Sequence, residues 1–181
     1  MIKFVKIKVD RKNKIYRNIN FLEDIYNLYK QYNRFLNDDF VQNDLLEEVL
    51  LTVERNSPFF WVILNDESFA GFVFLENIIG NSKNLYSAEI TTCFKQEFWG
   101  SFTRKVGRKF LQYCFKKLKF KKLKGLVFKE NTKTNTFLKS LGMKLEAELK
   151  SETLKNGRPQ DVQIFSITNN KKYGKENQND R

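Results

Sequence analysis

The chain contains no histidine among its 181 residues. Histidine is the usual general base at neutral pH and a frequent ligand of zinc. Its absence therefore excludes a histidine-based catalytic triad, a histidine general base and a histidine-containing zinc site. Any proton transfer must use a carboxylate, a tyrosine, another hydroxyl group or water, and the sequence leads us to expect no metal.

Cysteine is almost as scarce, since the chain has only Cys93 and Cys114. They lie far apart and lack the spacing of metal ligands, which indicates buried thiols and not a disulfide. The sequence also lacks an apolar run long enough to span a membrane, and Met1–Lys6 alternates apolar and basic residues where a signal peptide would be continuously apolar. We therefore expect a cytoplasmic protein without a membrane contact.

Acidic residues are outnumbered, with 21 Asp and Glu against 33 Lys and Arg, so the net charge is +12. A basic protein attracts phosphate, whether on a coenzyme, RNA, DNA or an acidic partner. Residues 98–129 contain no acidic residue at all. We interpret this strip as a solvated basic face over buried aromatic residues, with contact to nucleic acid as the minority alternative.

The length fits one domain, which we place at residues 1–169, followed by a polar tail at 170–181. In the first half of the chain, apolar residues at alternating or helical spacing predict five elements. They are a strand at 2–9, helices at 21–35 and 43–53, and strands at 59–64 and 69–75. Asn20 is the expected cap of the first helix, residues 56–58 break the chain after the second, and residues 77–84 are expected to form a loop.

The second half of the chain continues the alternation of strands and helices. The predicted elements are a strand at 86–94, a basic helix at 102–118, a strand at 123–128, a helix at 134–141, and a final hairpin at 143–154 and 162–167. The fold class is therefore α+β, in the order strand, two helices, three strands, helix, strand, helix and two strands.

The most informative segment runs from residue 131 to residue 161. Its order is an Asn that starts a short helix, a hydroxyl residue, a Leu-Gly helix end, a Glu in the next strand and a Gly-Arg-x-x-Asp turn: Asn131, Thr134, Leu141–Gly142, Glu146, Gly157–Arg158 and Asp161. It resembles the Gcn5-related N-acetyltransferase (GNAT) superfamily, especially its branch of ribosomal-protein and antibiotic acetyltransferases. The resemblance extends from Phe59 to Ile167.

This resemblance implies a twisted, mostly antiparallel mixed sheet flanked by helices, whose fourth and fifth strands splay apart. It also implies transfer of an acetyl group from acetyl-CoA to a primary amine by direct attack. The acceptor stays open among a protein N-terminus or lysine, an amino sugar, an aminoglycoside and a polyamine. A homodimer is compatible with the resemblance.

In the superfamily, backbone amides at a helix start bind the coenzyme pyrophosphate. The matching residues are Phe98, Trp99, Gly100, Ser101, Phe102, Thr103 and Arg104. Two registers are possible, and we favour the one in which Ser101 replaces the family's Gly and Thr103 its Ala. These replacements are small, and this register puts Val106 on a buried position of the helix.

The resemblance assigns the remaining roles residue by residue. Glu89 is the expected general base, with Glu76 as a second candidate. Thr134 offers a hydroxyl that could protonate the leaving thiolate, although a hydroxyl in the first turn of a helix is an equally simple interpretation. Asn131 and Thr91 are assigned to coenzyme binding.

Two further interpretations follow from the same residues. The acidic residues between 38 and 48 lie in the region that borders the acceptor cleft of the family: Asp38, Asp39, Asp44, Glu47 and Glu48. They either attract a cationic substrate or form plain solvated surface. The alternative to an enzyme is a GNAT fold that has lost catalysis and serves as a binding or structural subunit, for example in a nucleoprotein or viral particle. Ser101 at a glycine position and a fourth helix without tyrosine favour this alternative.

Overall fold

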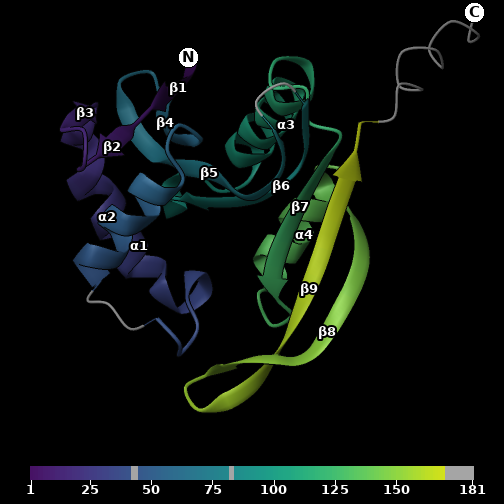
Figure 1. The fold of residues 1–181 in the computed structure, drawn as a ribbon. Helices are drawn as coiled ribbons and strands as arrows, with labels where there is room; N and C mark the ends of the chain where they lie inside the picture. The colour runs from purple at the N-terminus through teal and green to yellow at the C-terminus, as the bar shows by residue number, and fades with distance from the viewer. Residues whose placement is uncertain (42–44, 82–83, 170–181) are drawn as a thin grey trace, which may run out of the picture.

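The computed structural model describes residues 1–41, 45–81 and 84–169. Its main sheet has seven strands in the order β1-β4-β5-β6-β7-β9-β8 (Figure 1). The strands are Ile2–Lys6 (β1), Phe60–Asn65 (β4), Ser68–Asn81 (β5), Asn84–Phe94 (β6), Lys122–Phe128 (β7), Lys144–Lys155 (β8) and Arg158–Thr168 (β9). This is the mixed α+β architecture predicted from the sequence.

Four α-helices cover the two faces of this sheet within the described residues: Leu22–Leu36 (α1), Leu45–Arg55 (α2), Ser101–Lys116 (α3) and Thr132–Ser140 (α4). Successive residues of a strand point to opposite faces. Phe72 and Phe74 of β5 consequently pack in one cluster with α1 and α2, whereas Val73 and Leu75 pack with α3. Apolar residues of α4 join the cluster under α3 and a smaller one against β9.

The sheet divides where β6 and β7 meet. All neighbouring pairs are antiparallel except β6 and β7, which are parallel and paired only from Ser87–Glu89 to Lys122–Lys124. Beyond Glu89 and Lys124 the two strands separate, and we call this region the fork. The splay predicted from the resemblance is therefore present, and it leaves the β7 side of β6 without a strand partner beyond Glu89.

The N-terminal strand is shorter than predicted. One strand over residues 2–9 is wrong, because the chain leaves the sheet at Ile7, which is fully buried. The next residues form a separate hairpin of Lys8–Asp10 (β2) and Ile15–Arg17 (β3) that packs against α2. Anchoring Ile7 in the core redirects the backbone, which alternation of apolar residues alone does not reveal.

The loop predicted at residues 77–84 is also wrong in its described part. β5 continues to Asn81 and β6 begins at Asn84. Asn and Gly are turn formers, but here the ladder accommodates them through register shifts on either side of Ile79. Asn77 and Gly80 take positive φ angles at these irregularities, of 47° and 142°. Cross-strand pairing thus overrides the local turn preference.

In the described part of the chain, the helix ends lie within two residues of the predicted ones, but the predicted cap of the first helix is wrong. A 3₁₀ turn at Ile19–Phe21 (η1) precedes α1, whose N-terminal boundary residue is Phe21 with no side-chain cap, so the predicted cap by Asn20 is wrong. Gly142 follows α4 with a φ of 84°, and its amide donates to the carbonyl of Lys139. That left-handed conformation suits glycine and ends the helix as expected.

Gly107 lets α3 approach α4 closely. A Cβ at this position would lie 2.7 Å from Leu141 Cδ1 and 3.1 Å from Phe137 Cζ, both on or next to α4. Any side chain at this position would force the ends of the Leu141 and Phe137 side chains to move, so the packing beneath the fork is tight at this glycine.

We therefore predict that Gly107→Val lowers the free energy of unfolding by about 1–3 kcal/mol through overpacking. Urea unfolding followed by circular dichroism measures this loss. Gln112→Ala on the exposed side of the same helix is the matched control and should stay within about 0.5 kcal/mol of the wild type. Equal stability of Gly107→Val and the wild type would contradict the close approach.

Candidate functional site

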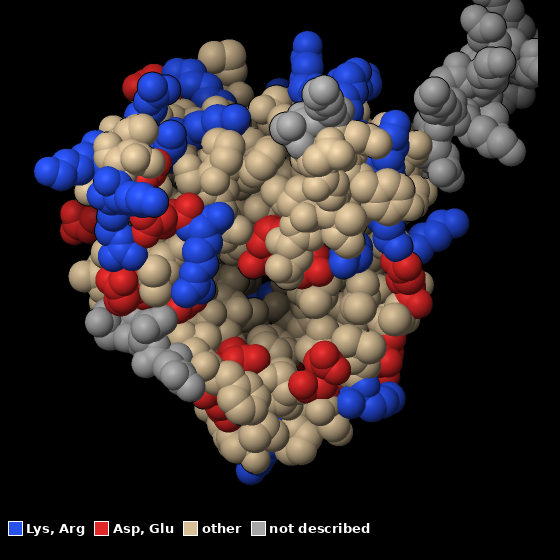
Figure 2. All heavy atoms as spheres, in the orientation of Figure 1, with Lys and Arg blue, Asp and Glu red and all other residues tan. Residues whose placement is uncertain are grey.

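A polar pocket lies between the sheet and the helices α1 and α2. Its volume is about 470 Å³, and side chains from α1, α2, β5 and β6 line it: Tyr29, Leu36, Asn37, Glu48, Thr52, Arg55, Asn56, Phe74, Glu76, Asn77 and Thr91. The space-filling view is hollowed between the α1–α2 side and the β8–β9 hairpin, with acidic side chains around the hollow (Figure 2). Such a recess suits a small polar or cationic ligand.

The pocket has a carboxylate on the sheet, Glu76 of β5, the strand that pairs with β6 at the fork. Glu76 sits at the last regular position of β5, where Thr91 Oγ1 donates a hydrogen bond to its Oε1 at 2.8 Å. Burial raises the pKa of the Glu76 carboxyl, the hydrogen bond from Thr91 opposes this, and the negative charge of Glu89 raises the pKa further. A carboxyl with a raised pKa and a cavity beside it is suited to accept a proton.

Glu89 lies directly opposite Glu76 in the β5–β6 pairing. Its carboxylate is held on both sides, by Lys124 Nζ at 2.9 Å and by Asn77 Nδ2 at 2.7 Å. The Glu89 side chain is only 16% exposed. The two carboxylates named from the sequence are thus brought together on one face of the sheet, and Glu76 is the one among the pocket-lining side chains.

The acidic residues of the 38–48 region divide between structural and pocket positions. Asp39 accepts hydrogen bonds from the amides of Asn156 and Gly157, both at 2.8 Å, and Asp38 accepts one from the hydroxyl of Thr153. These bonds dock the tip of the β8–β9 hairpin onto the segment after α1, as the ribbon view shows (Figure 1).

Of the other members of that region, Glu48 lines the polar pocket, and Glu47 forms an ion pair with Arg11. Asp44 lies outside the described residues. Lys155, also at the hairpin tip, is buried with its ammonium 3.8 Å from the Phe128 ring centroid. Most of the acidic stretch therefore holds structure, and Glu48 is its member in the pocket.

The N-terminus of α3 follows directly from Gly100. That residue has a φ of 100° and no side-chain cap serves the first turn. The first backbone bond of the helix runs from the amide of Arg104 to the carbonyl of Gly100, so the amides of Ser101, Phe102 and Thr103 precede it. Uncapped amides at the positive end of a helix dipole can bind a phosphate group.

The first turns of α3 have a buried and an exposed side. Thr103 and Val106 are buried, at 7% and 1% exposure, whereas Arg104 is exposed. Thr103 therefore occupies an inward position that suits a small residue, and its hydroxyl donates to the carbonyl of Gly100 at 3.0 Å. Phe102 packs against Phe98, with ring centroids 5.0 Å apart.

Trp99 connects three elements in front of this helix. Its Nε1 donates to the carbonyl of Phe94 at the end of β6, at 3.1 Å. Its ring lies 5.8 Å from the ring of Tyr32 in α1, and the ammonium of Lys133 in α4 lies 4.5 Å from its centroid. Trp99 is 40% exposed, in contrast to the buried Trp61, so its environment will respond to a ligand at this turn.

Asn131 and Thr134 form the start of α4. The side chain of Asn131 caps the helix by accepting a bond from the amide of Thr134 at 3.2 Å. Thr134 is half-buried in the first helical turn, which is the structural position anticipated for it. Its role as an acid and the contact of Asn131 with the coenzyme remain predictions.

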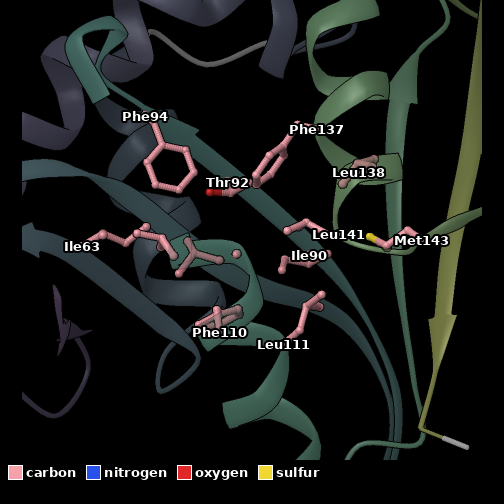
Figure 3. A pocket seen from close by; sticks show the side chains of 13 residues that line it. Ile63, Ile90, Thr92, Phe94, Phe110, Leu111, Phe137, Leu138, Leu141 and Met143 are labelled. Carbon is pink, nitrogen blue, oxygen red and sulfur yellow. The ribbon is translucent and has the colours of Figure 1, made fainter. Parts of the chain in front are cut away.

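The opposite side of the fork is apolar. A cavity of about 20 Å³ lies there, lined by residues of β4, β5, β6, α3 and α4 and by Met143 (Figure 3). Figure 3 shows Phe94 of β6 and Phe137 of α4 turned toward each other, with ring centroids 6.3 Å apart. With almost no polar lining, this small cavity offers no site for an ammonium group.

The two thiols lie in the core, as predicted. Burial raises the pKa of Cys93 to about 12 and that of Cys114 still further. Both therefore stay protonated at neutral pH and are not nucleophiles, which agrees with direct attack by the amine. In the part of the chain that the structure describes, no group of three or more Cys, Asp or Glu side chains is placed to hold a metal ion.

Besides Glu48, Glu76 and Thr91, which the sequence had singled out, the pocket contains polar residues that were not predicted as site residues, among them Thr52 and Asn56. Glu48, Thr52 and Asn56 follow one another at intervals of four along or just after α2 and therefore share one face. A polar face on a helix that also buries Val49 and Val53 was a detectable signal. The hydroxyl of Tyr29 donates a hydrogen bond of 2.8 Å to the side chain of Asn37. Asn37 directly follows the last residue of α1, and the end of the helix there places it near Tyr29.

No helix of the described residues is long and apolar enough to cross a membrane. A comparison with curated proteins finds no match. The family model of the acetyltransferase (GNAT) domain, by contrast, matches residues 21–144, which is more than half of the chain.

Solved structures agree with this match. The spermidine N-acetyltransferase of Vibrio cholerae, in complex with CoA and spermine, is 24% identical with a TM-score of 0.70, over 92% of this chain and 95% of that one. A chimera of that enzyme and hSSAT is 25% identical, with a TM-score of 0.68 and coverages of 92% and 94%. A GNAT-family acetyltransferase of Bacillus anthracis is 13% identical, with a TM-score of 0.67 and coverages of 92% and 94%.

These likenesses show the fold, and the family model shows the family. The superfamily predicted from the sequence is confirmed, whereas the branch of ribosomal-protein and antibiotic acetyltransferases stays a prediction. The chain belongs to the GNAT acetyltransferase family, and it is an N-acetyltransferase whose co-substrate is acetyl-CoA.

Proposed function

We propose that this protein acetylates a primary amine of a polyamine-like cation bound in the polar pocket. The observation that carries the proposal is Glu76, a pocket carboxylate with a raised pKa that lies one strand away from the fork. The pocket holds two carboxylates, Glu48 and Glu76, against one cationic side chain, Arg55, so it favours a cationic ligand over a hydroxyl-rich neutral sugar. The structural likeness to spermidine N-acetyltransferases supports the same acceptor class.

We expect the coenzyme to bind at the N-terminus of α3, which follows β6 in the chain. We infer that its pyrophosphate binds the amides of Ser101, Phe102 and Thr103, where the helix dipole favours negative charge. Arg104 and Lys105 are exposed in the first turn and add positive charge. The pantetheine arm would then follow the open edge of β6 beyond Glu89, whose backbone groups have no strand partner on that side.

In this arrangement the thioester reaches the fork and the amine reaches it from the pocket. Glu76 takes the proton of the ammonium, directly or through water, and the neutral amine attacks the thioester carbon. A backbone amide of β6 stabilises the oxyanion, and the carbon–sulfur bond then breaks. As the carbon–sulfur bond breaks, the attacking nitrogen loses its second proton and the thiolate of CoA gains one. Thr134 is the proposed donor to the sulfur and regains its proton from that nitrogen, directly or through water, so the products are the neutral amide and CoA.

The contacts favour Glu76 over Glu89 as the base. Glu89 was the first choice from the sequence, but Lys124 and Asn77 already hold its carboxylate. Glu76 has one hydrogen bond from a neutral hydroxyl, and burial disfavours its charged form. A carboxylate whose charged form is less stabilised accepts a proton more readily. Glu76 is therefore the better base of the two.

We predict that acetyl-CoA binds with micromolar affinity and changes the fluorescence of Trp99. Calorimetry at moderate salt measures the affinity, and tryptophan emission measures the local response. Trp99→Phe should abolish the emission change, since Trp61 is only 2% exposed. Absence of binding at millimolar coenzyme would contradict the proposal and favour the catalytically inactive alternative.

The acceptor class is tested with a panel of amines at saturating acetyl-CoA. We expect kcat/KM for spermidine to exceed that for an amino sugar or a peptide with a single amine by about tenfold or more, as one additional ion pair would provide. An aminoglycoside also carries several ammonium groups, and a preference for spermidine over it would reflect the fit of a flexible chain to the pocket. Glu48→Gln should raise KM for spermidine while kcat changes little. A preference for the peptide would overturn the polyamine assignment but not the acetyl transfer.

The base is tested by Glu76→Gln, which keeps the shape of the side chain but cannot accept a proton. We expect kcat/KM to fall by about 10²–10⁴-fold. In the wild type, kcat/KM should decline as the pH falls through the pKa of Glu76, which lies above the ordinary value for glutamate. Glu67→Gln in the exposed β4–β5 turn is the control. A Glu89→Gln variant with the larger loss would instead restore Glu89 as the base.

A further inference from the structure

Lys124 and Glu89 form the last residue pair of β6 and β7 before the fork. Their side chains bridge the two strands with an ion pair of 2.9 Å, and both are mostly buried, at 24% and 16% exposure. An ion pair of limited exposure is screened less by salt and water than one on the surface. Its charges therefore influence the neighbouring groups.

The group next to this pair is Glu76. The β5–β6 register places Glu76 directly opposite Glu89, so the two carboxylates lie on the same face of the sheet. Like charges at directly opposite positions of an antiparallel pair repel each other. Lys124 donates to Glu89, as does the neutral side chain of Asn77, whereas Glu76 accepts a bond from the neutral hydroxyl of Thr91. Among these three partners of the carboxylate pair, Lys124 is the one that carries a charge.

We propose that Lys124 is a positioning residue that neutralises Glu89 at the fork and thereby controls the proton affinity of Glu76 during acetyl transfer. This inference rests on the proposed function, in which Glu76 is the base. It adds a residue of β7, from the other half of the splayed sheet, to a site otherwise built from α1, α2, β5 and β6.

The other ionisable groups around Glu76 come from each element packed against it. Tyr29 of α1 stays neutral, since burial raises the pKa of its phenol to about 12. Glu48 and Arg55 of α2 line the same pocket and carry opposite charges. Glu89 of β6 and Lys124 of β7 complete the set, and they are the two whose charges the following variants remove.

Removing either charge should move the acid limb of the kcat/KM profile in opposite directions. Lys124→Met leaves Glu89 without its cation, which raises the pKa of Glu76 and moves the limb to higher pH. Glu89→Gln removes the anion, which lowers the pKa and moves the limb to lower pH. Each shift should be on the order of 0.5 to 1 pH unit, because both charges lie on the same face of the sheet within two strands of Glu76. The double variant should lie between them, near the wild type.

The chain offers a matched control on the same strand. Lys122 lies two residues before Lys124, shares its face, and pairs with Glu146 at the edge of the sheet. Lys122→Met therefore removes an ion pair of the same kind without touching the carboxylate pair, and its profile should coincide with the wild type. Lys124→Arg should keep the wild-type profile because it keeps the charge.

A second readout does not need turnover. Carbon-13 spectra of protein labelled at the glutamate carboxyl groups report each titration, and Glu76→Gln identifies the signal of Glu76 by its loss. Thermal unfolding of every variant shows that it is folded at the pH values used.

Opposite shifts of the Glu76 signal in Lys124→Met and Glu89→Gln, with parallel shifts of the kinetic limb, support the proposal. An unchanged Glu76 titration in folded Lys124→Met, or shifts of both variants in the same direction, overturns it. If the Glu76 signal shifts as expected but the wild type acetylates no amine, the electrostatic coupling stands and the proposed function fails.

Discussion

The parting of β6 and β7 after the Glu89–Lys124 pair is the constraint on which the rest of the site depends. In the sheet, three parallel residue pairs between β6 and β7 join its two halves. Beyond them the backbone edge of β6 is open, and an extended chain of a ligand can take the place of a strand. The Glu89–Lys124 ion pair lies at the last paired position, where this opening begins.

The two faces of the fork differ in chemistry because the strands alternate. One set of β5 and β6 side chains meets α3 and α4 in apolar packing, where Gly107 allows the helices to approach and Phe94 and Phe137 fill the space. The other set carries Glu76, Glu89 and Thr91 toward α1 and α2. A neutral coenzyme arm and a charged amine can therefore approach the same strand from environments suited to each.

The tip of the β8–β9 hairpin is bound to the segment that follows α1. Asp39 holds the amides at the hairpin tip, and Lys155 is buried against the ring of Phe128 beside it. Carboxylates that seemed available to a substrate are thus partly used to join the two halves of the molecule. Glu48 and Glu76 remain in the pocket together with Arg55, and burial raises the pKa of Glu76.

The sequence by itself determined the order of the elements from the strand at Phe60 onward, the buried thiols, the glycine that ends α4 and the family. These depend on local spacing: alternation in strands, helical periodicity, and residues that favour caps and turns. It also named both carboxylates of the β5–β6 pair. Local preference failed where a long-range contact won, at the buried Ile7 and in the bulged ladder around Ile79.

Only the tertiary structure decided which carboxylate faces the pocket and which is held. Glu89 and Lys124 are 35 residues apart in the chain, and Asp39 and Gly157 are 118 apart. Their pairing follows from strand register and from the docking of the hairpin, which no spacing along the sequence encodes. The charge at the fork is therefore a property of the folded sheet, because burial and the neighbour across the strand determine what each carboxylate can do.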